Sequence, residues 1–281
     1  MIRADAAGVG KLGDRVVNRL GFGSMRLTPR ADTSVAIKVV RAAVELGVDH
    51  IDTAAFYVSP GGVLDVGEGA PRYATELIRK ALHPYPRELV LATKVGPWAE
   101  TADDLRAHVH ENLRRLGVER LDLVNLRLTG RGGSLAERFR VLADLRAEGL
   151  IRDLGLSNAT LDQVDEASAI APVVCVQNSY AVDLRRDDDL VPALAARGIA
   201  FVPFFAIAGP RREDGASDDH DEAVRRIART HGVTPHQIRL AWTLHQGPNV
   251  LAIPGTGDPR HLRENIAAGA VRLTADELAA L

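Results

Sequence analysis

The most constraining feature of this sequence is a strand-like apolar run followed by a helix-like periodic run, an alternation that recurs eight times between residues 19 and 269. Strict alternation of this kind predicts a parallel sheet, and eight rounds that close on themselves predict an α/β fold of the TIM barrel type, a (β/α)8 barrel. Glycines at 47, 117, 149, 198 and 232 end five helix-like runs, where helices favour a left-handed residue. The rounds pair residues 19–25 with 34–47, 48–52 with 73–82, 89–94 with 101–117, 121–127 with 134–149, 151–158 with 160–170, 173–180 with 187–198, 199–205 with 221–232 and 235–247, and 250–257 with 259–269.

Length and charge limit the classes of protein to consider. The 281 residues, 46% of them hydrophobic, fit one barrel of about 250 residues, so we expect a single domain over residues 1–281. Lys and Arg total 35 against 37 for Asp and Glu, which gives no excess positive charge for nucleic acid or anionic lipid. The first residues lack the apolar core of a secretory signal, and no apolar run approaches a membrane span. We therefore expect a cytoplasmic protein.

Several local features favour ordinary structural roles. Gly8 to Gly13 match a dinucleotide-binding pattern formally, but without a buried strand before them or a helix after them, so we interpret them as part of an N-terminal β-hairpin. Cys175 lies within an apolar run and is expected to be a core thiol. The histidines lack the spacing of metal ligands, and we predict no metal site. Residues 58–72 are rich in glycine and proline, which predicts an irregular loop that either lies in solvent or forms a lid over the site.

Three ionisable side chains mark a candidate active site. Asp52 ends one strand-like run, Tyr57 follows it after a short turn, and Lys94 ends the next run. Because parallel strands finish at one edge of a sheet, we expect the three groups to converge there. The lysine is expected to lower the pKa of the phenol, while the carboxylate keeps the lysine charged. The group would then serve as a proton donor.

At these positions the chain resembles the aldo-keto reductases, through DTAAFY, LATK, GLSN, VQNSY and IPGTGDPRHLREN at the expected strand ends. The resemblance extends along the whole chain and implies an NADPH-dependent barrel enzyme without metal. It implies catalytic roles for Asp52, Tyr57, Lys94 and Arg127 in the reduction of a carbonyl, with Tyr57 as the general acid.

Arg127 stands where this family usually has a histidine. A guanidinium stays protonated, so it can hold and polarise a carbonyl but cannot relay a proton. Two cations beside one phenol should lower the pKa of Tyr57 further. A purely structural ion pair is the alternative role. The surrounding LDLVNLR, with VVCVQNSY and GIAFVPFF, resembles the bacterial pyridoxal reductase branch of the family, which shares this arginine.

The same resemblance implies a cofactor site. Ser157, Asn158 and Gln177 would bond the nicotinamide carboxamide, although alone they equally suit a helix cap and a polar strand end. Phe204 would stack on the nicotinamide, although alone it suits the core. Gly255 and His261 stand where a lysine and an arginine are usual, so Arg260, Arg263 and the free N–H groups of the helix after Asp258 are expected to attract the 2′-phosphate of NADPH. The implied cofactor-binding set is Gly23, Ser24, Met25, Asp52, Ser157, Asn158, Gln177, Phe204, Phe205, Ala206, Ile207, Gly255, Thr256, Arg260, His261, Glu264 and Asn265.

The sequence thus favours an NADPH-dependent oxidoreductase that acts on a small-molecule aldehyde or ketone, such as a pyridoxal-like aromatic aldehyde or a biosynthetic carbonyl. Two alternatives stay open: a nucleotide-binding regulatory subunit of the same fold, and a biosynthetic reductase of an imine or larger ketone. The intact Asp52, Tyr57 and Lys94 argue against the regulatory subunit. The sequence leaves the physiological substrate and the oligomeric state open.

Overall fold

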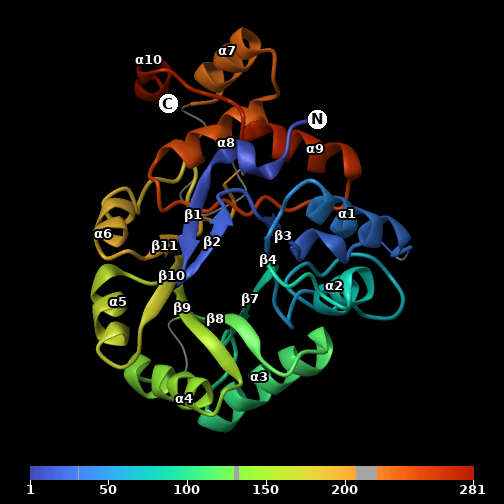
Figure 1. Ribbon diagram of the computed structural model, residues 1–281, viewed down its shortest axis with the longest axis vertical. Helices are drawn as coiled ribbons and strands as arrows, with labels where there is room; N and C mark the ends of the chain where they lie inside the picture. Colours follow the sequence, from blue (N-terminus) through green and yellow to red (C-terminus); the bar gives the residue numbers. More distant parts are fainter. Residues whose placement is uncertain (31, 130–132, 207–219) are drawn as a thin grey trace.

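The computed structural model describes residues 1–30, 32–129, 133–206 and 220–281, and its core is a barrel of parallel strands (Figure 1). Seven strands form one sheet in the order β11-β10-β9-β8-β7-β4-β3. Parallel bridges from Val250 to Phe201 and from Ala252 to Leu20 join the two edges of this sheet and close it. The predicted barrel is confirmed. The strands are β3 (Phe22–Gly23), β4 (His50–Asp52), β7 (Val90–Val95), β8 (Leu121–Arg127), β9 (Ile151–Ser157), β10 (Val173–Gln177) and β11 (Ala200–Phe201).

Three of the predicted strands are much shorter than expected. The run at 19–25 forms a ladder only at Phe22–Gly23. The run at 250–257 takes part only through its two bridges, and the run at 199–205 forms a ladder only at Ala200–Phe201. Pro203 and Pro254 lie in the latter two runs and have no N–H to donate, so each interrupts a regular ladder.

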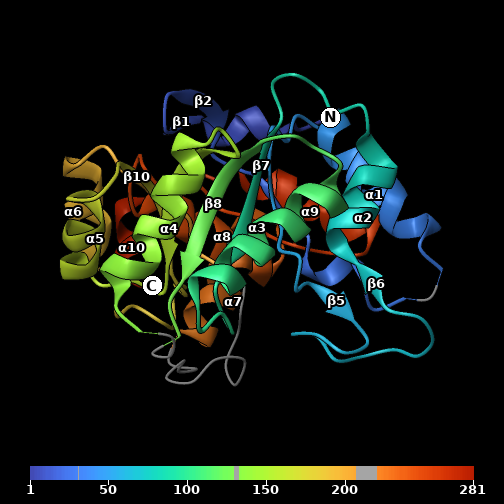
Figure 2. The same cartoon turned by 90° about the horizontal axis from the view of Figure 1, so that it is seen from below.

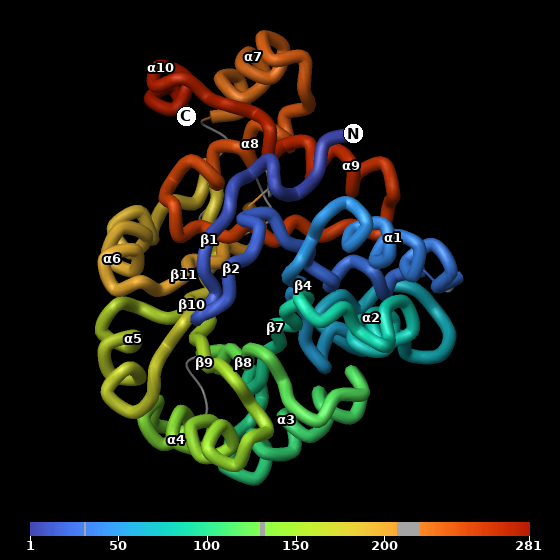
Figure 3. Tube along the Cα trace, in the orientation of Figure 1, coloured from blue at the N-terminus to red at the C-terminus, as the bar shows by residue number. Residues whose placement is uncertain are grey.

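Helices surround the barrel close to the predicted positions (Figure 3). Thr101, Thr160 and Thr234 cap three of them with capping boxes. At the first helix either Thr33 or Asp32 was expected to be the cap; the N-cap position is Thr33, whose side chain makes no capping bond, and Asp32 Oδ1 accepts from the Ser34 N–H at 2.9 Å. All five predicted C-terminal glycines have positive φ. The helices are α1 (Ser34–Glu45), α2 (Ala74–Leu82), α3 (Ala102–Leu116), α4 (Leu135–Ala147), α5 (Leu161–Ser168), α6 (Leu190–Ala196), α7 (Asp221–His231), α8 (Pro235–His245), α9 (Pro259–Ala268) and the unpredicted α10 (Ala275–Ala279).

The predicted N-terminal hairpin is present, and it closes one end of the barrel. Strand β1 (Val9–Leu12) pairs antiparallel with β2 (Arg15–Asn18). Leu12 and Val17 are buried in the same apolar cluster as Val90, Leu123 and other inward side chains of the strands. Figure 2 shows the hairpin at one end of the molecule and the ribbon β5 (Val58–Ser59) and β6 (Arg72–Tyr73) at the other. The barrel is therefore filled with side chains and closed at its N-terminal end.

The loop between β5 and β6 is irregular over residues 60–71, as predicted, although its two ends pair as a short antiparallel ribbon. Arg72 holds it down by donating from Nε to the carbonyl of Thr28 at 2.8 Å and from Nη1 to the carbonyls of Glu68 and Ala70, both at 3.0 Å. The loop is thus tied to the barrel on the side opposite the hairpin.

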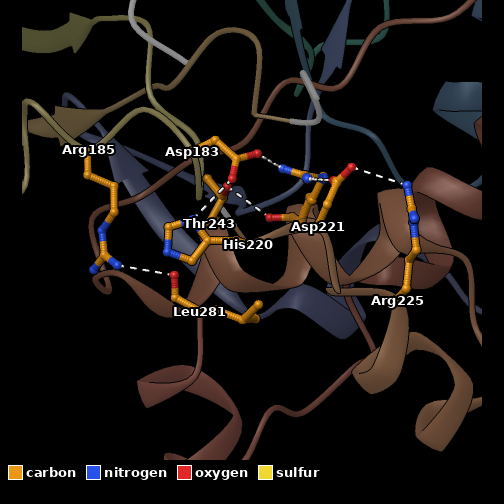
Figure 4. Close-up of polar contacts among 8 residues, drawn as sticks. Asp183, Arg185, His220, Asp221, Arg225, Thr243 and Leu281 are labelled. Atoms are coloured by element: carbon orange, nitrogen blue, oxygen red, sulfur yellow. Dashed lines mark hydrogen bonds and ion pairs between the residues drawn. The ribbon is translucent and has the colours of Figure 1, made fainter. Parts of the chain in front are cut away.

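A buried ion network fixes α7 to the barrel wall (Figure 4). The side chain of Asp183 is fully buried and accepts from the guanidinium of Arg239 on α8 and from His220 at 3.1 Å. Arg239 also donates to Asp221 in the first turn of α7. Because both acids bond the same buried guanidinium, its charge is paired and hydrogen-bonded.

Candidate active site

The predicted convergence of Asp52, Lys94 and Tyr57 is confirmed at the C-terminal end of the strands. Lys94 extends from β7 and donates to both carboxylate oxygens of Asp52, at 2.7 and 2.6 Å. Its ammonium also lies 4.9 Å from the centre of the Tyr57 ring. From β10, Gln177 donates to Asp52 Oδ1 at 2.6 Å. All four side chains are buried, so their charges interact in a poorly screened environment.

The expected lowering of the Tyr57 pKa is wrong in its net direction. Burial raises the pKa of this phenol most, Asp52 raises it further, and together these effects outweigh the lowering by Lys94 and by Arg127. The two cations act as predicted, but the tyrosine is only 9% exposed. A buried phenol loses more solvation on ionising than these cations return. Tyr57 is therefore protonated at neutral pH.

The lysine follows the prediction. Burial acts to lower the pKa of Lys94, but Asp52 and Tyr57 together outweigh it and the net direction is upward. The ammonium thus stays charged beside the phenol, which positions it to stabilise negative charge on the tyrosine oxygen as a proton leaves.

Arg127 ends β8 in the same row as Ser157 of β9 and Gln177 of β10. Its Nη1 donates to Ser157 Oγ at 3.4 Å, and the guanidinium carbon lies 5.2 Å from the centre of the Phe204 ring. No ion pair to Arg127 occurs within the described residues, which argues against the structural salt bridge. The charge therefore faces the site, and among the described residues no carboxylate neutralises it.

A cavity of about 910 Å³ opens above these groups. Of the predicted residues it is lined by Gly23, Met25, Asp52, Tyr57, Arg127, Phe204, Phe205, Ala206 and Gly255. Ser24, Lys94, Ser157 and Gln177 are buried and do not line it. The predicted Ile207 lies outside the described residues.

Part of the cavity wall is formed by residues that were not predicted from the sequence. Phe56 packs edge-on against Tyr57 on one side and Trp98 on the other, with ring centres 5.3 and 5.4 Å apart. Val63 and Leu64 of the 58–72 loop also line the cavity, which favours the predicted lid over a purely solvated loop. The sequence positions of Phe56 and Trp98 could have revealed them, because each residue follows a strand that already contributes a residue to the site. Arg26, Pro97, Thr129, Ile253 and Pro254 complete the wall.

The residues beside the cavity fit a nicotinamide cofactor. Gln177 Oε1 and Ser24 Oγ are buried and have no hydrogen-bond partner within the described part of the chain. A carboxamide offers the donors and acceptor that such atoms lack. Asn158 is held with φ of +62° and donates from Nδ2 to the carbonyl of Leu128 at 3.3 Å, while its backbone N–H donates to the carbonyl of Gln177. The segment 157–158 is thus fixed next to Gln177.

The N–H groups at the start of α9 were expected to be free to bind the 2′-phosphate of NADPH, and this expectation is wrong. The Asp258 side chain accepts from the backbone N–H of Arg260 at 2.7 Å and of His261 at 3.2 Å. These bonds lower the pKa of Asp258, so the helix start carries a carboxylate. Arg260 lies 3.8 Å from Glu264 and 3.1 Å from the His261 ring. Thr256 and Asn265 are buried, and none of these residues lines the cavity. A phosphate here would depend on side chains such as Arg260 and Arg263.

Comparison with known proteins agrees with this geometry. The model of the Aldo/keto reductase family matches residues 19–281, nearly the whole chain and all of the barrel. The chain belongs to the aldo/keto reductase family. It is therefore an oxidoreductase, as predicted, and the 18 residues before the matched segment contain the hairpin that closes the barrel.

Relatives of this reductase match almost all of its length. It is 42% identical to a pyridoxine 4-dehydrogenase of Escherichia coli, over 96% of each chain. It is 33% identical to an uncharacterised oxidoreductase of Schizosaccharomyces pombe, over 100% of this chain and 90% of the other. Among solved structures, a thermostable aldo-keto reductase in complex with the inhibitor epalrestat has a TM-score of 0.82 and 30% identity, covering 96% of this chain and 97% of the other. An aldo/keto reductase from Klebsiella pneumoniae in complex with NADP and acetate has a TM-score of 0.80 and 26% identity, covering 96% and 93%.

No group of three or more His, Cys, Asp or Glu side chains that could hold a metal ion occurs in the described ranges. No helix of residues 1–30, 32–129, 133–206 or 220–281 is long and apolar enough to span a membrane. Cys175 is fully buried inside the barrel, as predicted for a core thiol, and burial raises its pKa.

Proposed function

We propose that this protein is an NADPH-dependent reductase of aromatic aldehydes of the pyridoxal type, with Tyr57 as the general acid. The observation that carries the proposal is the buried set of Asp52, Lys94, Gln177 and Tyr57 beneath a cavity large enough for a cofactor end and a small substrate. The names of two relatives support its chemistry, one a pyridoxine 4-dehydrogenase and the other a reductase crystallised with NADP.

The chain's own residues account for the proton that reduction of a carbonyl requires. Tyr57 is protonated, faces the cavity and donates its hydroxyl proton to the carbonyl oxygen as charge develops there. Lys94 stabilises the resulting phenolate, while Asp52 holds the ammonium in place and is itself held by a hydrogen bond from Gln177. NADPH, when bound, supplies the reducing equivalent as a hydride. Gln177, Ser157 and Asn158 would hold its carboxamide, and Arg260 and Arg263 its phosphate.

Arg127 supports an aromatic aldehyde with an anionic oxygen next to the reacting group. Its guanidinium lies against the Phe204 ring and carries a charge that no carboxylate neutralises among the described residues. A planar, two-pronged donor can hold a phenolate and the neighbouring carbonyl oxygen together. Phe56 and Trp98 supply apolar walls for an aromatic ring.

The test is turnover with NADPH and pyridoxal, followed by absorbance of the reduced cofactor, in the wild type and Tyr57→Phe. Loss of the acid without change of shape should leave NADPH affinity unchanged and lower kcat by about 10² or more. Tyr85→Phe is the matched control, because that hydroxyl donates to the carbonyl of Leu116 and does not line the cavity. Turnover near the wild-type level in Tyr57→Phe would place the acid elsewhere. Absence of turnover in the wild type, in either direction, would favour a regulatory role.

A further inference from the structure

A second cavity, of about 370 Å³, lies at the opposite end of the barrel from the candidate active site. Every part of its wall comes from the segment before the hairpin, from the start of the β3 run, or from residues that end α8 and α9. Figure 1 shows the segment before the hairpin beside α8 and α9, at the top of the view. The lining residues are Ala7, Gly8, Arg19, Leu244, His245, Gly247, Pro248, Gly269, Val271 and Arg272.

The Arg19 guanidinium is fixed in this cavity by backbone carbonyls. Its Nε donates to the carbonyl of Val250 at 3.1 Å, and its Nη2 donates to those of Gly247 at 2.6 Å and Leu244. These bonds hold the planar group in one orientation. Among the described residues, Nη1 of Arg19 has no hydrogen-bond acceptor.

The Arg272 guanidinium is fixed in the same way from another side of the cavity. Its Nη1 donates to the carbonyls of Gly269 at 2.7 Å and Val271 at 3.2 Å, and its Nη2 to that of Ala6 at 2.7 Å. No ion pair within the described residues involves Arg19 or Arg272, and no acid lines the cavity. Carbonyl oxygens at helix ends offset part of the positive charge but cannot neutralise two guanidinium ions.

The two charges act on each other. Burial lowers the pKa of Arg19 most, and the charge of Arg272 lowers it further. Two fixed positive charges that face one cavity create a positive potential there, which favours a bound anion. Because the two side chains are already ordered, binding requires little further loss of conformational entropy.

We propose that this cavity binds a phosphate group, free or as a small monoester, between Arg19 and Arg272. Guanidinium groups match phosphate oxygens in geometry and in charge. The volume lies within the range of about 300 to 1,000 Å³ that is usual for small-molecule sites, and Leu244, Pro248 and Val271 give an apolar wall for an organic part. Because no residue of the candidate active site lines this cavity, the proposal is independent of the proposed function.

The experiment is calorimetric titration of the full chain, saturated with NADP⁺, with inorganic phosphate, with glycerol phosphate and with chloride at constant ionic strength. Saturating cofactor keeps the added phosphate away from the cofactor site. We expect one phosphate site per chain and no saturable binding of chloride. Tighter binding of glycerol phosphate identifies a monoester as the ligand, and tighter binding of inorganic phosphate identifies the free ion.

Variants locate the site. Arg272→Gln should weaken phosphate binding by about tenfold or more, since it removes a charge-assisted contact. Arg272→Lys, which keeps the charge but loses the fork, should weaken it less and tests the proposal even if Arg272→Gln unfolds. Arg226→Gln removes an exposed charge from α7 and should change nothing. The proposal is overturned if phosphate does not bind saturably, if Arg272→Gln binds as well as Arg226→Gln, or if binding is lost in Arg263→Gln, which would place the ion at the cofactor site.

Discussion

Replacing Asp52 by Asn tests the buried ion pair by a change that keeps shape and removes one charge. Lys94 is 1% exposed and donates to both oxygens of Asp52, so the variant leaves a buried ammonium without its counterion. Breaking a buried pair in this way costs about 3 to 5 kcal/mol of unfolding free energy. We expect a loss of this size at pH 6, measured by urea denaturation.

The loss should depend on pH with a defined sign. In the wild type the Lys94 pKa is raised, so the stability it contributes is complete below its unfolded pKa of about 10.4 and is lost only as pH rises through the folded value. In Asp52→Asn the largest remaining influence on Lys94 is burial, which lowers its pKa below the unfolded value. Between this lowered pKa and the unfolded value, the unfolded state of the variant binds more protons than the folded state. The free energy of unfolding of the variant therefore rises by up to about 1.4 kcal/mol per pH unit over that range. The difference in free energy of unfolding between the wild type and Asp52→Asn should therefore become smaller between pH 6 and pH 9.

Asp14→Asn is the matched control, because it breaks the ion pair with Arg152 at an exposed carboxylate. Its stability should stay close to that of the wild type at every pH. A gap for Asp52→Asn that is constant or widens with pH would refute the reasoning, since Lys94 would then not be the group that titrates.

Three further predictions concern the binding of substrate and cofactor. Arg127→His and Arg127→Lys should each lose about tenfold or more in kcat/KM towards pyridoxal, or about 1.4 kcal/mol, and less towards benzaldehyde, and an equal loss on both aldehydes would remove the substrate-specific role. Charge-assisted contacts from Arg260 and Arg263 should make NADPH bind more tightly than NADH by roughly 2 kcal/mol or more, whereas equal dissociation constants in a fluorescence titration would contradict this. Asp258→Ser should keep a cap on α9 but remove its negative charge, and so widen the NADPH preference, which an unchanged ratio of dissociation constants would disprove.

The sequence predicts the barrel well because each round carries a strong periodic signal and its own end signals. Thr101 and Gly117, for example, cap the two ends of α3. It predicts poorly where closure of the barrel overrides local pattern. Residues 250–257 look like a full strand, yet they contribute single bridges because Pro254 cannot donate to a ladder. α10 is too short to leave a periodic signal.

In the candidate site, too, some features follow from the sequence and others only from the folded structure. The convergence of Asp52, Lys94 and Tyr57 follows from the order of strand ends. The upward pKa of Tyr57 does not, because it depends on how much solvent the folded cavity excludes. Likewise, the sequence shows that Asp258 precedes α9, but only the folded chain shows that this carboxylate accepts from the N–H groups assigned to phosphate.

The hairpin that closes the barrel also orders events during synthesis on the ribosome. Leu12 and Val17 leave the ribosome first, but Leu251 and Ile253, with which they are buried, leave it almost last. At about 5 to 20 residues per second, roughly 12 to 50 seconds separate the synthesis of the hairpin from the synthesis of these last partners. Contacts so distant in sequence form late and cannot guide early folding. The apolar cluster around the hairpin therefore stays incomplete through almost all of translation, and Val9 and Val16 are still exposed in the finished fold.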